Sequence, residues 1–235
     1  MRFANLDGRL QVPGFRGLIA NGLAAFSGPT AWMLARQSIL RHGAIQHVDE
    51  LTTFAKIVRA RQPRRILEIG TAQGGMFWLL CRLAAPDCVL ISLDLPSDDR
   101  FSGGNPQTLN LPAMKCAGQT VHSILGNSHS PEMPDRVGKF LNGELLDLLF
   151  IDGDHTYAGV RSDYLMYQPL VRPGGLIAFH DIVKTPWVGC EVDRFWAELM
   201  QDHELNPRTI IGHFRSHWGG IGLVERKRLC MAAPA

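Results

Sequence analysis

Short apolar runs recur along the chain from residue 65 onward, and segments with helical spacing separate them. Runs of this length, rich in Val, Ile, Leu and Phe, favour β-strands. We predict strands at Ile66–Ile69, Val89–Leu93, Val121–Leu125, Leu145–Ile151, Leu176–Phe179, Thr209–Ile211 and Gly220–Val224. The fourth run is apolar almost throughout, which is typical of a parallel sheet covered by helices on both faces.

Apolar residues at helical spacing fill the gaps between these strands. They predict helices over Phe77–Ala84, Val160–Tyr167 and Val188–Leu199. Alternating strands and helices imply right-handed crossovers and a parallel sheet. The last two strands follow each other without a convincing helix, which indicates an antiparallel hairpin. We therefore predict an α/β fold: a Rossmann-like, doubly wound, mostly parallel seven-stranded sheet with an antiparallel C-terminal hairpin and an N-terminal helical extension.

The first 60 residues have a different pattern. Glycine and proline interrupt the first thirty residues, and a helix is predicted over Ala31–Arg41. A second helix is indicated by apolar residues on one side, from Ile45 to Val58. We divide the chain into an N-terminal helical cap or dimerisation arm, residues 1–60, and a ligand-binding domain, residues 61–235. An arm of this kind also suggests a homo-oligomer.

Composition narrows the possible partners. The 24 Lys and Arg residues and 22 Asp and Glu residues leave a net charge of +2, too small a field to attract nucleic acid or an anionic membrane. The five cysteines include no C-x-x-C pair, which suits a reducing compartment. No apolar run approaches the ~20 residues that cross a bilayer. We expect a cytoplasmic protein that binds neither nucleic acid nor a membrane.

Small and acidic residues stand where the first three predicted strands end. The first strand runs into Glu68-Ile-Gly70-Thr71-Ala-Gln-Gly74-Gly75, the second ends at Asp94, and the third is followed by Asn127 and Ser128. Ligands of parallel sheets bind beyond these strand ends, where glycine lets the backbone approach closely and a carboxylate can accept ribose hydroxyls. Singly, each feature is explained as well by a turn, a strand end or a helix cap. Together they favour an adenosine-type ligand.

The glycine spacing argues against a nucleotide held by its phosphates. The pattern Gly-x-x-x-Gly-Gly is neither the dinucleotide fingerprint nor a P-loop, and a Glu68 carboxylate would repel phosphate but suit a cationic ligand. The run Arg65-Ile-Leu-Glu-Ile-Gly-Thr-Ala-Gln-Gly-Gly resembles motif I of class I S-adenosylmethionine-dependent methyltransferases. The resemblance extends from about Ile45 to the C-terminus. It implies that Glu68, Gly70, Thr71, Gly74 and Gly75 line the methionine half, that Asp94 holds the ribose, and that Asn127 and Ser128 lie near the adenine.

Ionisable residues gather where the fourth and fifth strands end. These residues are Asp152, Asp154, His155, His180 and Asp181, and adjacent parallel strands would bring them together at one cleft. One interpretation is a divalent metal held by Asp152 and Asp181, with His180 as a possible third ligand. The alternative for His180 is a hydrogen bond to the backbone. We assign Asp154 to the N-cap of the following helix.

The segment from Phe150 to Tyr164, with Pro173-Gly-Gly-Leu-Ile-Ala-Phe-His-Asp, resembles a narrower group. These are the small metal-assisted O-methyltransferases related to the cephalosporin-biosynthesis and macrolide-sugar enzymes and, more distantly, to the catechol type. The resemblance implies that Asp152 and Asp181 bind the metal, Mg²⁺ being the expected ion, and that His155 is the general base. His180 stands where several relatives have a carboxylate.

The predicted function is therefore S-adenosylmethionine-dependent O-methylation of a small hydroxylated acceptor, such as a sugar or a natural-product scaffold. The long loop Pro96–Asn110, Trp187 and the segment His213–Trp218 are candidates for the acceptor pocket. Two alternatives remain open: an NAD-dependent oxidoreductase, which shares the sheet and Asp94, and a non-catalytic methyltransferase-like binding protein. The glycine spacing counts against the first, and the presence of Asp152, His155 and Asp181 counts against the second.

Overall fold

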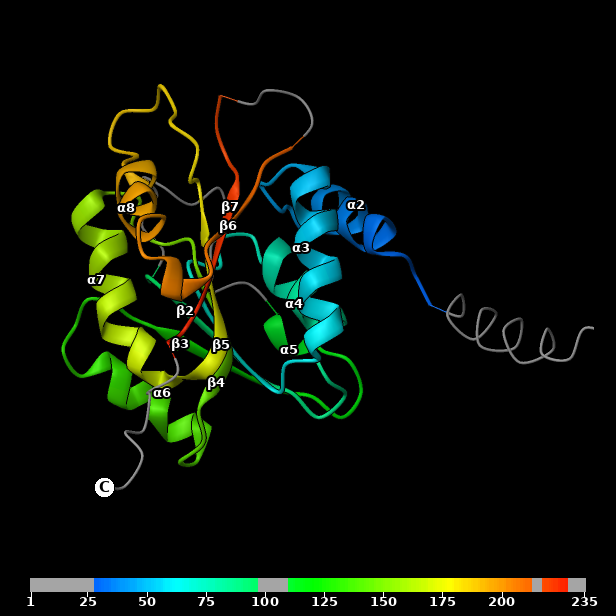
Figure 1. Ribbon diagram of the computed structural model, residues 1–235. Coiled ribbons are helices and arrows are strands. Elements are labelled where there is room, and N and C mark those ends of the chain that lie inside the picture. The colour runs from blue at the N-terminus through cyan, green and yellow to red at the C-terminus, as the bar shows by residue number, and fades with distance from the viewer. Residues whose placement is uncertain (1–27, 97–109, 213–216, 228–235) are drawn as a thin grey trace, which may run out of the picture. The chain divides into compact units, whose positions relative to one another are not determined.

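A seven-stranded sheet forms the centre of the unit Ala31–Ala235 in the computed structural model, which describes residues 28–96, 110–212 and 217–227 (Figure 1). The strand order is β3-β2-β1-β4-β5-β7-β6. The strands are β1 Arg65–Ile69, β2 Val89–Asp94, β3 Thr120–Leu125, β4 Leu146–Ile151, β5 Val171–His180, β6 Arg208–Ile210 and β7 Ile221–Glu225. Each overlaps a strand predicted from sequence, so the prediction of seven strands is confirmed.

The pairing confirms the predicted topology. Strands β1 to β5 are joined by parallel pairing, and β7 pairs antiparallel with both β5 and β6. The chain runs outward from β1 through β2 to β3 and then crosses back to β4 on the other side of β1. This reversal at β1 and β4 is the switch point beyond which doubly wound sheets bind their ligands.

Helices cover both faces of the sheet (Figure 1). Helices α2 Ala31–His42, α3 Val48–Arg61, α4 Gly75–Leu83 and α5 Leu111–Met114 contribute to one buried apolar cluster. Helices α6 Met133–Leu141, α7 Tyr157–Tyr167 and α8 Val192–Leu199 contribute to a second cluster on the opposite face. Two 3₁₀ turns, η1 Gln168–Leu170 and η2 His203–Leu205, complete the described elements.

Helices α2 and α3 share one buried apolar cluster with helix α4. Leu51, Phe54 and Val58 of α3 are at most 1% exposed, and the Phe54 ring lies 5.6 Å from that of Phe150 on β4. Burial of such side chains stabilises a fold by roughly 1.5–3 kcal/mol each. The two helices therefore belong to the same compact unit as the sheet. Their predicted role as a cap or dimerisation arm stays a prediction.

Two helix predictions differ from the structure. The helix predicted over Val188–Leu199 begins too early, because α8 starts at Val192. Val188 is fully exposed, and Gly189 adopts a left-handed φ of 90° that a helix does not allow. Helix α6 was not predicted, although Met133, Val137 and Leu141 are buried at helical spacing. Of the described residues, none forms a helix that is both long and apolar enough to cross a bilayer.

Candidate functional site

The loop after β1 passes unusually close to the end of β4. Gly70 has a φ of 85°, and a Cβ placed on it would lie 2.1 Å from the Asp152 carbonyl oxygen. Only glycine fits this position, because any other side chain would collide with backbone and adopt an unfavourable φ. The first glycine of the predicted motif thus brings the β1 loop against Asp152.

The second pair of glycines serves the start of α4. Gly74 has a φ of 81° and precedes the helix, and Gly75 is its first residue. A Cβ on Gly75 would lie 2.1 Å from the Ala44 backbone nitrogen, in the linker between α2 and α3. The absence of a side chain at Gly75 therefore lets the α2–α3 linker pack against the start of α4, a contact that the sequence analysis did not predict. Its predicted contact with a cofactor stays a prediction.

Asp94 fixes the same loop from the neighbouring strand. Its Oδ2 accepts hydrogen bonds from the backbone N–H groups of Thr71, at 3.0 Å, and Ala72, at 2.8 Å. Its Oδ1 accepts from Leu95 N–H at 2.8 Å. An ionised carboxylate offers about four acceptor positions, so one remains for a ligand hydroxyl. Asp94 and Asp152 consequently lie on either side of one loop, as the predicted site requires.

Glu68 lies beneath the same loop. Its side chain is completely buried, and Thr71 Oγ1 donates to its Oε2 at 3.0 Å. Burial raises the pKa of Glu68 well above its usual range, the Thr71 hydrogen bond opposes this increase, and the charges of Asp152 and Asp94 add to it. The predicted place of Glu68 in the methionine half of a donor site stays a prediction.

Asn127 and Ser128 form the turn beyond β3, next to the end of β2. Asn127 Oδ1 accepts from His129 N–H at 2.9 Å, and the Ser128 carbonyl accepts from the Tyr167 hydroxyl at 2.8 Å. The Gly126 N–H donates to the Asp94 carbonyl, which joins this turn to β2. The structure therefore places both residues at the predicted edge of the sheet. Their contact with adenine stays a prediction.

A buried ion pair holds this turn against α7. His129 Nε2 lies 3.3 Å from Oδ1 of Asp163, whose side chain is 0% exposed. The hydrogen bond with Asp163 is the largest influence on His129 and raises its pKa despite partial burial. Gly153 lies against the other Asp163 oxygen, because a Cβ there would come within 3.5 Å of it. Asp163 thus connects the turn after β3 with the loop after β4.

We expect the His129–Asp163 pair to make stability depend on pH. A histidine whose folded-state pKa is raised contributes full stability below its unfolded pKa of about 6.5 and loses it as the pH rises through the folded value. Above about pH 6.5 the unfolding free energy of the wild type should therefore decrease with rising pH. The unfolding free energy of the Asp163→Asn variant, measured by urea denaturation, should decrease less over the same pH range. Asp135→Asn, on the exposed surface of α6, is the matched control. Identical pH profiles for wild type and Asp163→Asn would contradict the role of the pair.

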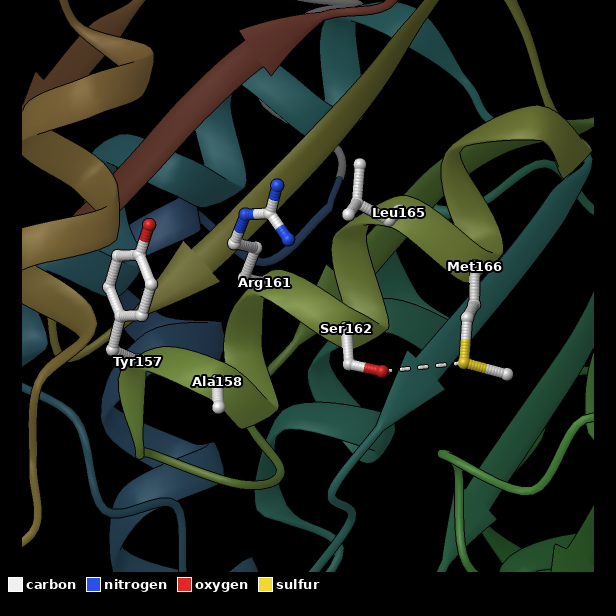
Figure 2. A pocket seen from close by; sticks show the side chains of 6 residues that line it. All are labelled: Tyr157, Ala158, Arg161, Ser162, Leu165 and Met166. Carbon is white, nitrogen blue, oxygen red and sulfur yellow. Dashed lines mark hydrogen bonds between the residues drawn. The ribbon is translucent and has the colours of Figure 1, made fainter.

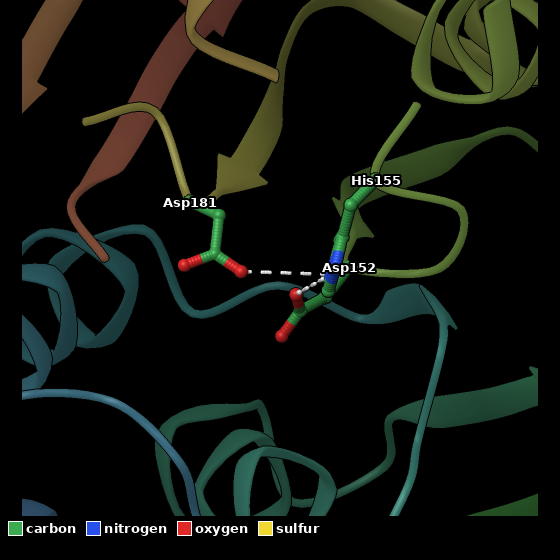
Figure 3. Close-up of side chains that lie close together, drawn as sticks. All are labelled: Asp152, His155 and Asp181. Atoms are coloured by element: carbon green, nitrogen blue, oxygen red, sulfur yellow. Dashed lines mark hydrogen bonds and ion pairs between the residues drawn. The ribbon is translucent and has the colours of Figure 1, made fainter. Parts of the chain in front are cut away.

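The ionisable residues beyond β4 and β5 converge as predicted (Figure 3). His155 Nε2 lies 3.3 Å from Asp152 Oδ1 and 3.5 Å from Asp181 Oδ2. His180 Nδ1 lies 3.3 Å and 3.4 Å from the same two oxygens. Asp181 has a left-handed φ of 57°, a conformation that aspartate tolerates better than most residues. Strained positions of this kind cluster at functional sites.

Charge holds the cluster together. Burial alone would raise the pKa of Asp152, but His180 and His155 lower it to about 2. Burial alone would lower the pKa of His180, but Asp152 and Asp181 raise it to about 10. Burial alone would also lower the pKa of His155, but Asp152 and Asp181 raise it. The carboxylates thus favour the protonated forms of the two imidazoles, and the imidazoles favour the ionised form of Asp152.

The donor set fits a divalent cation. Ligand atoms of Asp152, His155 and Asp181 lie within 4.8 Å of one another, so one ion could contact all three. His180 Nε2 is buried without a hydrogen-bond partner among the described residues, while its Nδ1 faces the carboxylates. Carboxylate and imidazole ligands suit Mg²⁺, Mn²⁺ or Fe²⁺. The predicted set Asp152, His180 and Asp181 is therefore compatible with the geometry, and His155 is an equally near neighbour.

Asp154 does not cap α7. The N-cap is Thr156, whose Oγ1 accepts from Gly159 N–H at 3.0 Å. Asp154 Oδ1 accepts from Thr156 N–H at 2.9 Å and so stabilises the turn before the helix. The helix begins one residue later than expected, which transfers the cap to the threonine. The prediction for Asp154 was wrong.

A small cavity lies beside this cluster. It has a volume of about 40 Å³, and residues from three segments line it: the α2–α3 linker, the loop after β1 with the start of α4, and Asp152. Gln46 of the linker donates from Nε2 to Asp152 Oδ2 at 3.0 Å, across 106 positions of sequence. The sequence analysis did not single out Gln46. No periodicity or motif marks a glutamine in a linker.

The candidates for the acceptor pocket lie partly outside the described residues. This applies to most of the loop Pro96–Asn110 and to residues 213–216. Trp187 is half exposed, and its ring lies 5.6 Å from that of Trp218, which in turn lies 4.1 Å from the His47 ring. The segment after β5, the β6–β7 connection and the α2–α3 linker thus meet at these rings. That they bind an acceptor stays a prediction.

A larger hollow, of about 520 Å³, lies on the outer face of α7 (Figure 2). The described residues that line it all belong to α7, from Tyr157 to Met166, and Figure 2 shows their side chains along one side of the helix. It includes none of the ionisable residues that converge at the strand ends. We assign it no part in the chemistry.

Residues 67–182 match the family described as "Methyltransferase domain". This range begins in β1 and ends just after Asp181, so it contains both the glycine motif and the acid–imidazole cluster. The match identifies residues 67–182 as a methyltransferase domain, and the sheet topology is that of the predicted Rossmann-like fold. The resemblance noted from the sequence motifs is confirmed.

Curated relatives match parts of the chain. An uncharacterized protein, y4gI, from Sinorhizobium fredii is 28% identical over 148 residues, which are 61% of this chain and 16% of the relative. A mycinamicin VI 2''-O-methyltransferase from Micromonospora griseorubida is 32% identical over 69 residues, 29% of this chain and 17% of the relative. The chain thus spans about one sixth of the length of these two relatives.

Solved structures share the fold. The methyltransferase MycE of the mycinamycin pathway, in complex with Mg, S-adenosylhomocysteine and mycinamycin VI, has a TM-score of 0.57 at 19% identity, covering 89% of this chain and 56% of MycE. The O-methyltransferase TomG from Streptomyces achromogenes, in complex with S-adenosylmethionine, also has a TM-score of 0.57, at 20% identity, covering 93% of this chain and all of TomG. At these identities the likeness establishes the fold.

Proposed function

We propose that this protein is an S-adenosylmethionine-dependent O-methyltransferase that acts on a hydroxyl of a small molecule, assisted by a divalent cation. The observation that carries the proposal is the meeting of two features at the switch point of the sheet. One is the glycine loop after β1, which packs on Asp152, and the other is the cluster of Asp152, His155 and Asp181. Asp152 thus belongs both to the proposed donor site and to the acid–imidazole cluster.

Relatives support the same chemistry. The mycinamicin relative is by name a 2''-O-methyltransferase, and TomG is described as an O-methyltransferase bound to S-adenosylmethionine. MycE was crystallised with Mg, S-adenosylhomocysteine and its macrolide. By analogy we assign Gly70, Thr71, Gly74 and Gly75 to the methionine half of the donor, Asp94 to the ribose, and Asn127 and Ser128 to the adenine.

His155 is the residue best placed to meet an acceptor. Its side chain is 40% exposed, whereas those of His180 and Asp181 are at most 5% exposed. In the reaction the acceptor oxygen attacks the methyl carbon, the carbon–sulfur bond breaks, and the hydroxyl proton passes to His155 Nε2. Asp152 and Asp181 orient this imidazole and stabilise its protonated form. Such a base contributes about 10²–10⁴-fold to the rate.

The divalent cation would be held by Asp152 and Asp181, with His180 as the buried nitrogen ligand. Such an ion supplies Lewis acidity that lowers the pKa of a bound hydroxyl. His180 is well suited to a fixed ligand because it is 4% exposed and lies in β5, paired with Ile221 of β7. His155, on a loop, remains free to serve the acceptor.

Calorimetry tests the donor site first. The wild-type protein should bind S-adenosylhomocysteine and should not bind NAD, because the glycine loop lacks the dinucleotide spacing. Incubation with a donor carrying a deuterated methyl group and a panel of hydroxylated metabolites, read by mass spectrometry, should then reveal a labelled product. Binding of NAD alone would favour the oxidoreductase. Binding of S-adenosylhomocysteine without transfer to any acceptor would favour a non-catalytic binding protein.

A further inference from the structure

The α2–α3 linker is fitted closely over the glycine loop. A Cβ on Gly43 would lie 2.0 Å from the Gln73 side chain, and the Ala44 backbone packs directly on Gly75. The Ala44 N–H donates to the Ser38 carbonyl at 3.1 Å, which ties the linker to the end of α2. These contacts hold the next residues, Ile45 and Gln46, at the wall of the 40 Å³ cavity.

Hydrogen bonding fixes the orientation of the Gln46 amide. The side chain is only 8% exposed, and its nitrogen lies 3.0 Å from Asp152 Oδ2. An ionised carboxylate can only accept hydrogen bonds, so the group that faces Asp152 Oδ2 is the NH₂ donor. The other atom is therefore the carbonyl oxygen, Oε1. It is buried and has no hydrogen-bond partner among the described residues.

A buried acceptor without a partner is unfavourable, so such an atom in a residue that lines a cavity points to a ligand. Gln46 and Asp152 both line the cavity, and the Gln46 carbonyl and the Asp152 carboxylate are both hydrogen-bond acceptors. They favour a compact cationic donor and disfavour a phosphate or a carboxylate. The volume of about 40 Å³ matches a group the size of an ammonium ion.

We propose that Gln46 is a binding residue for the α-ammonium group of S-adenosylmethionine, which donates a hydrogen bond to Gln46 Oε1. This assignment rests on the proposed function. Gln46 then connects the two halves of the site, because its NH₂ group orients the Asp152 carboxylate while its carbonyl holds the donor. It also gives the α2–α3 linker a direct role in choosing ligands that carry an amino group.

The test compares two ligands that differ only in the amino group. These are S-adenosylhomocysteine and its deamino analogue, in which 4-thiobutyrate replaces homocysteine. Calorimetry gives the dissociation constants for the wild type, Gln46→Ala and Gln46→Met, the last of which keeps the volume of the side chain. Gln201→Ala, on an exposed residue after α8, is the matched control. Circular dichroism verifies that each variant folds.

We expect both Gln46 variants to weaken S-adenosylhomocysteine by about 10-fold to 100-fold, the range for a hydrogen bond to a charged group. The affinity for the deamino analogue should change little in the same variants, and Gln201→Ala should change neither. An equal loss for both ligands would overturn the proposal and leave Gln46 a purely structural residue. Unchanged affinities would overturn it as well. A wild-type protein that bound neither ligand would instead refute the proposed function, and the inference with it.

Discussion

Replacing His155 by alanine is expected to lower kcat by about 10²–10⁴-fold while the affinity for S-adenosylhomocysteine stays nearly unchanged. The reason is the separation of roles at the site. The imidazole contacts Asp152 and Asp181 and is the most exposed member of the cluster, whereas the donor is assigned to the loop after β1. Single-turnover kinetics with a deuterated methyl donor, and calorimetry with S-adenosylhomocysteine, measure the two quantities separately.

His203→Ala provides the control for this experiment, because His203 lies on the exposed turn η2 and outside the cluster. It should leave both quantities at the wild-type value. Turnover of His155→Ala at the wild-type rate would remove this residue from the mechanism. A large loss of donor affinity in the same variant would show that His155 shapes the donor site, contrary to the proposed separation.

Removal of divalent cations with excess EDTA is expected to lower activity by about 10²-fold or more, since Lewis-acid activation contributes several kcal/mol. Addition of Mg²⁺ in excess of the chelator should restore it. The expectation rests on the two carboxylates, whose oxygens Asp152 Oδ1 and Asp181 Oδ2 each lie within 3.5 Å of both imidazoles. Initial rates across a Mg²⁺ titration provide the measurement.

The same carboxylates favour the protonated forms of His180 and His155, because they raise the pKa of both imidazoles. A cation bound through His180 must displace its proton, so the apparent affinity for the cation should increase as the pH rises toward about 10. The Asp181→Asn variant should require far more Mg²⁺ for half-maximal activity. Full activity of the wild type in excess EDTA would exclude the metal from the reaction.

The sequence predicted which residues lie at the carboxyl ends of the strands, because parallel pairing places all of these ends at one edge of the sheet. Apolar runs fix the strands, helices between them fix the direction, and the carboxyl ends then lie at one edge. Asp94, Asp152 and Asp181 therefore lie at the same edge of the sheet, as expected. The glycine motif could be recognised too, although the sequence predicted close approach of its backbone to a ligand and not the approach of Gly70 to the Asp152 backbone.

Contacts made by loops were not predictable in this way. Gln46 reaches Asp152 across 106 residues, and this contact depends on how the α2–α3 linker seats on Gly75. The complete burial of Glu68, which raises its pKa, could not be read from the sequence. Asp154 was assigned to the N-cap of α7 in error, because a small shift in the start of a helix changes which side chain caps it, and here the cap is Thr156.

The packing of α3 on β4 affects where this chain can be shortened. A fragment that began near residue 61, as the sequence pattern invites, would uncover the apolar surface that Leu51, Phe54 and Val58 now occupy. It would also lack the amide that contacts Asp152. The compact unit Ala31–Ala235 is therefore larger than the range that matches the methyltransferase family, and a shortened chain should retain α2 and α3.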